Sequence, residues 1–236
     1  MSIFTILAPI SLYSTRFGIV IVALFCMEFS RNILRPDTKI VVFDLDGTLY
    51  YKSGMVRRMM FHAPLEWRMM WVERTTRKHL RGDWYGDKDT FYKMYFQHMA
   101  NGRLFSSNYA RWWYNTRYMP LMVKVIRDFY QPAPWVLPFI QQCKAIGIRM
   151  VVLSDYDHTI EKLQALGLDV SLFDWVISAP ELGGLKPAPQ LMQCVAVKMG
   201  VLPQQCLVIG DRDDTDGELA RSVGATYWRC NSENPR

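Results

Sequence analysis

Short continuous runs of apolar residues recur along the chain, and helical patterns separate the later runs. Such runs are typical of strands that are buried on both faces of a parallel sheet. We expect strands at 40–43, 150–153, 175–178, 206–209 and 225–228, and helices at 135–145, 158–166, 190–199 and 216–223. This alternation predicts an α/β fold with a Rossmann-like core, in which helices cover both faces of a parallel sheet.

Residues 51–131 follow a different pattern, in which aromatic and Met residues recur at spacings of three and four. This spacing predicts amphipathic helices, so the fold class includes an inserted all-helical cap at 51–131, with the core at 39–50 and 132–236. Because residues at helical spacing usually belong to the core, we expect the aromatic and Met stripe to be buried. Its members include Met55, Met59, Met60, Trp67, Met70, Trp71, Tyr95, Phe96, Met99, Trp112, Trp113, Tyr118 and Met122.

Residues 1–38 form an apolar leader ahead of the first predicted strand. Its most apolar part, 17–25, is too short to span a bilayer comfortably. No basic segment precedes it and no clear cleavage site follows it, so a secretory signal fits poorly. Arginines flank it, so an amphipathic or anchoring association of residues 3–29 with a membrane stays open, as does a true start at Met27.

Charge is unevenly distributed along the 236 residues, whose formal net charge is +6. The predicted cap carries 15 Lys and Arg against 6 Asp and Glu, whereas residues 132–236 carry 9 against 12. A basic module beside an acidic one suits a negatively charged substrate, and it also suits nucleic acid or a membrane surface. The five scattered cysteines form no CxxC pair, which indicates reduced thiols and a cytoplasmic protein. The alternative is a protein held at the inner face of a membrane by its leader.

Polar residues gather where the predicted strands end. Asp44 and Asp46 follow the first strand, Ser154 ends the second, Asp211 follows a later one, and Lys186 lies in a glycine-rich loop. In a parallel sheet such loops converge on one crevice, and buried carboxylates there need a compensating cation. Hard divalent cations prefer oxygen ligands, so the pattern predicts a metal and an anion at this edge. The ordinary alternatives are helix caps for the acids and Ser154 and a solvated loop lysine for Lys186.

These segments resemble the motifs of the haloacid dehalogenase superfamily, in particular its phosphoglycolate-type phosphatases. The resemblance covers residues 39–229 in order and spacing, and the helical insert falls where that superfamily places a cap. One departure is Asp155, which stands after Ser154 where the superfamily often has Asn or Thr. The matching segments are Asp44-Leu45-Asp46-Gly47-Thr48, Ser154, Lys186-Pro187, and Gly210-Asp211 with Asp216.

The resemblance implies a Mg²⁺-dependent phosphatase that hydrolyses a small phosphate monoester through an aspartyl-phosphate. Asp44 would be the nucleophile, Asp46 the general acid and base, and Lys186 a charge-stabilising group. The metal ligands that it implies are Asp44, Asp46 through its backbone carbonyl, Asp211 and Asp216. The phosphate-binding residues are Ser154, Thr48, Gly47 and Lys186.

Several alternatives stay open. A phosphomutase of the same superfamily would use the same aspartates. A nucleic-acid-binding protein that uses the basic, aromatic cap is the alternative from another class, and a buried aromatic stripe would argue against it. We therefore expect no nucleic acid and, as partner, a nucleotide, a sugar phosphate or phosphoglycolate. Arg57 and Arg58 follow the first motif closely, so we expect them to reach the crevice mouth and contact the substrate.

Overall fold

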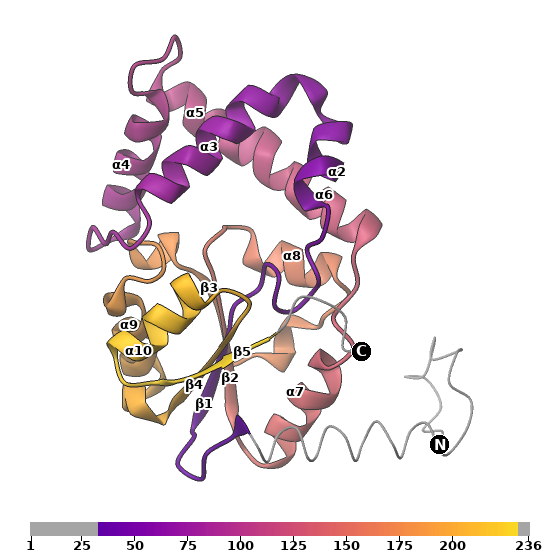
Figure 1. Ribbon diagram of the computed structural model, residues 1–236, viewed down its shortest axis with the longest axis vertical. Coiled ribbons are helices and arrows are strands. Elements are labelled where there is room, and N and C mark those ends of the chain that lie inside the picture. The colour runs from indigo at the N-terminus through magenta and orange to yellow at the C-terminus, as the bar shows by residue number, and fades with distance from the viewer. Residues whose placement is uncertain (1–32, 231–236) are drawn as a thin grey trace.

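A five-stranded parallel sheet forms the centre of the core, and a layer of helices lies above it (Figure 1). The computed structural model describes residues 33–230. The strand order is β3-β2-β1-β4-β5, so the fully apolar β1 lies in the middle of the sheet. All five predicted strands are confirmed, as β1 Ile40–Phe43, β2 Arg149–Ser154, β3 Trp175–Ser178, β4 Cys206–Gly210 and β5 Thr226–Arg229.

Helices cover both faces of this sheet. Because successive side chains of a strand point to opposite faces, Val41 and Phe43 pack in one buried cluster and Ile40 and Val42 in another. The first cluster includes side chains of α7 and α8, and the second includes side chains of α9 and α10. These helices are α7 Val136–Ala145, α8 Thr159–Ala165, α9 Pro189–Met199 and α10 Glu218–Ser222. The predicted Rossmann-like α/β core is confirmed.

The segment between β1 and β2 is helical and lies over the carboxyl ends of the strands (Figure 1). We call residues 55–129 the cap, and the predicted all-helical insert is confirmed. The exact domain boundaries at 51 and 131 remain a prediction. The cap helices are α2 Met55–His62, α3 Trp67–His79, α4 Lys88–Ala100, α5 Ser107–Trp113 and α6 Met119–Phe129, with a 3₁₀ turn at Pro64–Glu66 and a π-helical turn at Tyr114–Tyr118.

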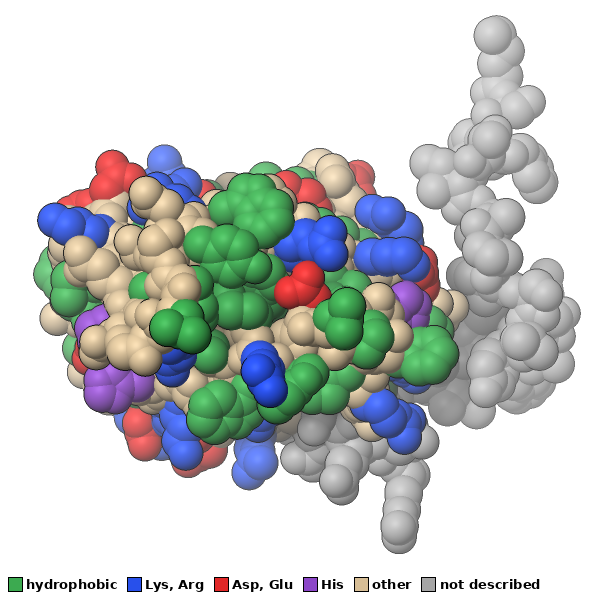
Figure 2. All heavy atoms as spheres, turned by 90° about the horizontal axis from the view of Figure 1, so that it is seen from above, with side chains coloured by type: hydrophobic (Ala, Val, Ile, Leu, Met, Phe, Trp, Pro, Cys, Tyr) green, Lys and Arg blue, Asp and Glu red, His purple; other side chains and the backbone are tan. Residues whose placement is uncertain are grey.

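The predicted burial of the aromatic and Met stripe is right for most residues and wrong for four. Trp67 and Trp71 are 49% and 61% exposed, and Met60 and Trp112 are exposed as well. The reason lies in α3, whose buried residues are Met70, Val72, Glu73 and Thr76, so its two tryptophans lie on the other side. Figure 2 views the cap from above and shows hydrophobic side chains interspersed with Lys and Arg.

The apolar leader, including residues 3–29, lies outside the described residues. Within residues 33–230 no helix has both the length and the apolar character needed to cross a membrane. Four cysteines in this part of the chain are free thiols, namely Cys143, Cys194, Cys206 and Cys230.

Candidate active site

Asp44 lies directly after β1 at the carboxyl edge of the sheet. Its backbone N–H donates to the carbonyl of Ile209 at 2.8 Å, which extends the pairing of β1 with β4 by one residue. The buried carboxylate accepts a hydrogen bond at Oδ2 from the Thr48 hydroxyl at 2.9 Å. Its Oδ1 lies 2.7 Å from Nζ of Lys186. Two fixed donors therefore hold Asp44 in one orientation.

Lys186 lies between two carboxylates. Its side chain is 3% exposed, and Nζ lies 2.7 Å from Oδ1 of Asp44 and 2.7 Å from Oδ1 of Asp216. The interpretation of Lys186 as a solvated loop lysine is wrong. Asp155 accepts a hydrogen bond from the backbone N–H of Lys186 at 3.0 Å, so the residue that departs from the superfamily pattern positions the lysine loop.

Asp216 reaches this cluster from a π-helical turn, Asp213–Gly217, that precedes α10. This turn replaces the beginning of the helix that the sequence predicts at 216–223. The carbonyl of Arg212 accepts hydrogen bonds from the N–H groups of Asp216 and Gly217, at 2.9 and 3.3 Å. A Cβ on Gly210 would lie 2.3 Å from the carboxyl carbon of Asp216, so only glycine leaves room for this side chain at the end of β4.

Asp46 has three side-chain partners. Its Oδ1 accepts from the Tyr50 hydroxyl at 2.7 Å, and its Oδ2 lies 2.5 Å from Nζ of Lys162 and 3.1 Å from Oγ of Ser154. Lys162 is fully buried in α8 and also donates to Oγ of Ser154 at 3.1 Å. The structure therefore brings Ser154 and Asp46 together through a second buried lysine that the sequence analysis missed.

Asp211 joins the site from the end of β4 and completes a group of three acids. One carboxylate oxygen from each of Asp44, Asp211 and Asp216 lies within 4.8 Å of the others, and we call these three the acidic cluster. A cation already stands beside them, because Nζ of Lys52 lies 2.7 Å from Oδ2 of Asp211 and 2.6 Å from the backbone oxygen of Asp46. An all-oxygen donor set that attracts a cation fits Mg²⁺.

The electrostatics of the cluster reflect a surplus of carboxylates. Burial and the neighbouring charge of Asp44 raise the pKa of Asp211, and burial raises the pKa of Asp216 to about 7 despite Lys186. Burial also acts against the charged form of Asp46. There, the charge of Lys162 and hydrogen bonds from Lys162 and Tyr50 outweigh it and lower the pKa. The charge of Asp46 is thus compensated, whereas the negative charge of the acidic cluster is compensated only in part.

A second buried group of charges links the cap to the loop after β2. Glu73 is fully buried and accepts hydrogen bonds from Nε of Arg77 at 2.8 Å and from two tyrosine hydroxyls, at 2.7 and 3.1 Å. Arg77 also donates to the backbone oxygen of Asp155 at 2.5 Å, and its guanidinium lies over the Tyr156 ring at 4.0 Å. We call this group the tyrosine cluster; its members are Glu73, Arg77, Tyr95, Tyr114 and Tyr118.

The cap also contacts the loop that carries Lys186. The N–H of Tyr85 donates to the carbonyl of Gly183 at 2.7 Å, and the N–H of Leu185 donates to the carbonyl of Asp83 at 3.0 Å. A Cβ on Gly183 or Gly184 would lie 2.6 Å from cap backbone atoms, so the paired glycines allow this close approach. One cap loop therefore holds the loop that ends at Lys186.

Arg57 and Arg58 are the predicted site residues that the structure does not join to the aspartates. Arg57 is exposed on α2. The Arg58 guanidinium lies over the rings of Phe129 and Tyr130, at 5.1 and 4.7 Å from their centroids. In the described part of the chain, the cations that pair with the site's aspartates are instead Lys52, Lys162 and Lys186.

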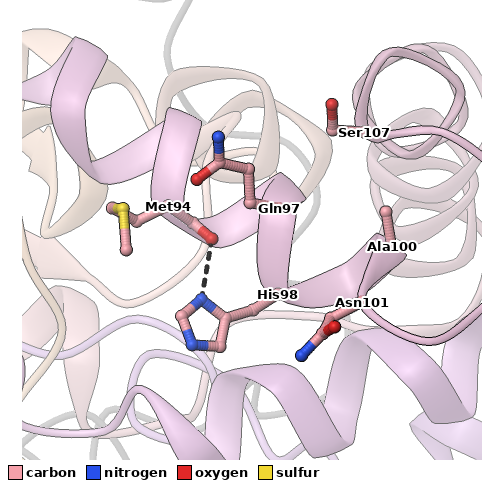
Figure 3. A pocket seen from close by; sticks show the side chains of 6 residues that line it. All are labelled: Met94, Gln97, His98, Ala100, Asn101 and Ser107. Atoms are coloured by element: carbon pink, nitrogen blue, oxygen red, sulfur yellow. Dashed lines mark hydrogen bonds between the residues drawn. The ribbon is translucent and has the colours of Figure 1, made fainter.

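Two hollows lie near the cap, and neither is lined by a predicted site residue. One of about 520 Å³ lies between cap and core, with Arg111 and Asn115 on one side and His158 and Glu181 on the other. The other, of about 390 Å³, lies beside α4 and the start of α5 (Figure 3). There the His98 ring bonds the Met94 carbonyl at 2.9 Å, and the lining carries no acid or lysine.

The arrangement of two aspartates after β1, a serine at the end of β2, a buried lysine and two further aspartates after β4 matches a known family. The profile of haloacid dehalogenase-like hydrolases matches residues 38–224. The chain belongs to this family. Membership in the haloacid dehalogenase-like hydrolases agrees with the resemblance of the four motifs, and it covers the cap as well as the core.

The relatives of this hydrolase differ in how much of each chain the similarity covers. Glyceraldehyde 3-phosphate phosphatase of Methanocaldococcus jannaschii is 28% identical over 78% of this chain and 81% of its own. Protein SUPPRESSOR OF QUENCHING 1, chloroplastic, of Arabidopsis thaliana is 35% identical, over 33% of this chain and only 8% of its own length. The crystal structure of a predicted phosphoglycolate phosphatase from Haemophilus somnus 129pt shares the fold, with a TM-score of 0.55, 18% identity, and coverage of 84% of this chain and 89% of that chain.

Two lysines at the site have no counterpart in the sequence analysis. Lys162 occurs in a predicted helix and Lys52 in a loop, where most lysines are solvated. The available signal was the number of acids expected at the sheet edge, which exceeds the one positive charge of Lys186. Counting charges over that edge, rather than motif by motif, would have indicated that further cations were needed.

Proposed function

We propose that this hydrolase is a Mg²⁺-dependent phosphatase of small phosphate monoesters. The observation that carries the proposal is the position of Asp44. Its carboxylate is held by Thr48 and Lys186 at the edge of the sheet, next to two further acids, and Asp46 follows two residues later in the chain. A fixed carboxylate beside a cation site is the arrangement that nucleophilic attack on phosphorus requires.

The reaction would proceed in two displacements on phosphorus. An oxygen of Asp44 attacks and forms a bond to phosphorus, while the bond to the leaving alcohol breaks and Asp46, in its protonated form, donates its proton to the departing oxygen. Water then attacks the aspartyl-phosphate and gives its proton to Asp46, which releases inorganic phosphate and restores the Asp44 carboxylate. Asp46 has hydrogen-bond partners on both oxygens, so Tyr50 and Lys162 keep it in place between the two steps.

Asp44, Asp211, Asp216 and the backbone oxygen of Asp46 would hold Mg²⁺. When bound, it supplies positive charge that offsets the acids and the phosphoryl oxygens. Lys186, which pairs with Asp44 and Asp216, would stabilise the same charge, and Ser154 would donate its hydroxyl proton to a phosphoryl oxygen in place of Asp46. Gly47 and Thr48 complete the loop around the phosphoryl group.

The proposed substrate is a small phosphorylated metabolite, such as a sugar phosphate, a nucleotide or phosphoglycolate. The relative from Methanocaldococcus jannaschii, named for glyceraldehyde 3-phosphate, supports this class. The excess of basic residues in the cap would attract such an anion to the sheet edge.

A screen of phosphorylated metabolites with Mg²⁺ tests the function, with release of inorganic phosphate as readout. We expect hydrolysis that a chelator abolishes, and a higher Mg²⁺ requirement in Asp211→Ala. Full turnover in EDTA, or an Asp211→Ala variant with an unchanged requirement, contradicts the metal role. Transfer of phosphate between positions of one sugar, with no phosphate released, would indicate a phosphomutase instead.

The exposed aromatic side of the cap supports a second candidate function, binding of single-stranded nucleic acid. Trp67 and Trp71 project from α3 beside the exposed Arg68 and Arg74, an arrangement that allows base stacking and phosphate contacts. The acids of α3 and of the turn before it are paired within the cap, Glu73 with Arg77 and Glu66 with Arg117.

Fluorescence anisotropy with a labelled oligonucleotide at low salt tests this candidate. Binding should weaken with added salt and in a Trp67→Ala/Trp71→Ala variant. The matched control is Leu202→Ala, which removes an exposed apolar side chain from the core. Absence of binding at low salt, or equal binding by both variants, argues against a nucleic-acid function.

A further inference from the structure

Lys52 binds two of the oxygens that the proposed metal would need. It lies in the loop between β1 and α2, and Nζ is 2.6 Å from the backbone oxygen of Asp46 and 2.7 Å from Oδ2 of Asp211. The proposed reaction gives Lys52 no part. A metal ion that binds both of these oxygens would have to lie between them, and the ammonium of Lys52 already occupies that position.

The loop is shaped to allow this contact. Gly47 has a φ of +107°, and a Cβ at this position would lie 2.6 Å from Nζ of Lys52 and 2.5 Å from Oδ2 of Asp211. A side chain here would therefore displace the end of the lysine or the carboxylate from its position, in addition to the strain of its backbone conformation. The glycine thus admits Lys52 to the acidic cluster as well as allowing the turn.

Lys52 differs from the two other lysines of the site in its access to water. Its side chain is 39% exposed, whereas the side chains of Lys186 and Lys162 are 3% and 0% exposed. An ammonium on a long flexible chain at the surface can exchange its partners for water at small cost. The two buried lysines have no comparable access to solvent.

We propose that Lys52 is an internal competitor of the divalent cation, so that its ammonium neutralises Asp211 until the metal displaces it toward solvent. Mg²⁺ requires oxygen ligands at about 2.0–2.1 Å, which an ammonium hydrogen-bonded to the same two oxygens prevents. Lys52 thereby sets the metal affinity of the site. This inference rests on the metal of the proposed function.

Isothermal titration of the full chain with Mg²⁺ tests the proposal without any measurement of turnover. If Lys52 holds its two oxygens about nine-tenths of the time, Lys52→Met should bind Mg²⁺ about tenfold more tightly than the wild type. The matched control, Lys144→Met, removes an equal charge from the exposed surface of α7 and should bind as the wild type does. Lys52→Arg keeps the charge and should bind more weakly than Lys52→Met.

Thermal unfolding supplies a second readout, with one expectation for the metal-free protein and another for the protein with Mg²⁺. Without added metal, Lys52→Met should unfold at a lower temperature than the wild type, because the acidic cluster loses a compensating charge. With saturating Mg²⁺ its gain in unfolding temperature should exceed that of the wild type. Wild-type or weaker Mg²⁺ affinity in Lys52→Met overturns the competition. If neither chain binds Mg²⁺, the metal of the proposed function is wrong, and the competition is wrong with it.

Discussion

Two buried groups of charges lie close together in this hydrolase, the acidic cluster at the sheet edge and the tyrosine cluster in the cap. In the tyrosine cluster one carboxylate, Glu73, faces one guanidinium, Arg77, and tyrosine hydroxyls donate to the remaining carboxylate positions. In the acidic cluster three carboxylates share one fully buried ammonium, that of Lys186.

The difference between the clusters is one of charge balance. A buried pair with every hydrogen bond satisfied gives the cap a defined internal geometry, and it has no capacity for a further ion. A buried group with more acids than bases has that capacity, as the raised pKa of Asp211 and of Asp216 indicates. A buried group whose positive and negative charges balance therefore indicates a structural role. A buried group with a surplus of one charge indicates a functional site.

Removal of the proposed nucleophile should give the largest effect. Asp44→Asn keeps the shape of the side chain and relieves part of the surplus charge, so we expect a folded protein with hydrolysis reduced at least about 1,000-fold. The assay is phosphate release from an aryl phosphate, with circular dichroism as a check on folding. Asp213→Asn is the control, because Asp213 pairs with Arg221 at the surface, in the turn after β4 that also carries Asp216. Near wild-type activity in Asp44→Asn would exclude the covalent route.

Lys162 provides the next test, since it binds the one site carboxylate whose charge is compensated. If Lys162→Met leaves Asp46 badly placed, turnover should fall about 100-fold for an alkyl phosphate, whose leaving oxygen needs a proton. Turnover should fall far less for 2,4-dinitrophenyl phosphate, whose leaving group departs without one. In an Asp46→Asn background the substitution should add little. An equal loss of turnover on both substrates would indicate that Lys162 serves packing and does not position Asp46.

The tyrosine cluster should respond in stability rather than in chemistry. Glu73→Gln leaves the Arg77 guanidinium buried without its carboxylate, which costs about 3–5 kcal/mol of the free energy of unfolding. Urea unfolding measures this loss, and kcat per folded molecule should change much less than in Lys162→Met. The matched control is Glu218→Gln, an exposed acid on α10. A variant with unchanged stability would show that the balanced cluster does not support the cap.

The smallest effect is expected at the exposed contact between cap and core, where Arg81 lies 2.5 Å from Asp214. Hydrogen bonds from Arg212 and Arg81 lower the pKa of Asp214 from 3.8 to about 2, although partial burial opposes this. A lowered carboxyl pKa stabilises the protein above pH 3.8, and the contribution is lost as the pH falls toward 2. Because Asp214 is half exposed, Asp214→Asn should cost less than about 1 kcal/mol at pH 7. Urea unfolding at pH 7 and pH 3 should give a difference that shrinks at the lower pH.

The sequence predicts the sheet and the acids at its edge because both depend on local pattern. Apolar runs indicate buried strands, and the carboxyl ends of parallel strands meet wherever the chain crosses over. Asp44, Asp46, Ser154 and Asp211 all follow this logic. The position of Lys186 required the resemblance to a family, because a lysine beside glycine and proline has no strong preference for burial.

The features that the sequence analysis missed depend on the direction of individual side chains. The local sequence pattern does not determine this direction. Helical spacing shows that α3 has a buried side, but Glu73 and Thr76 lie on it and Trp67 and Trp71 do not. Lys162 points inward, where its ammonium contacts Asp46 and Ser154, which lie far from it in the sequence or in another element. Lys52 is directed by the turn at Gly47. Each outcome is decided by tertiary contacts with residues far away or by loop geometry.

The contact between Asp83–Tyr85 of the cap and Gly183–Leu185 of the core bears on how this architecture can be recombined. Loops that touch through backbone atoms, with glycines where a Cβ would clash, have to change together. A chimera that receives the cap of another family member would place foreign atoms against Gly183 and Gly184 and shift the start of the lysine loop. Grafts that exchange both loops as one unit should keep Lys186 in register, whereas grafts of helices alone should not. The cap is therefore a poor interchangeable part, even though it is inserted at one point of the core.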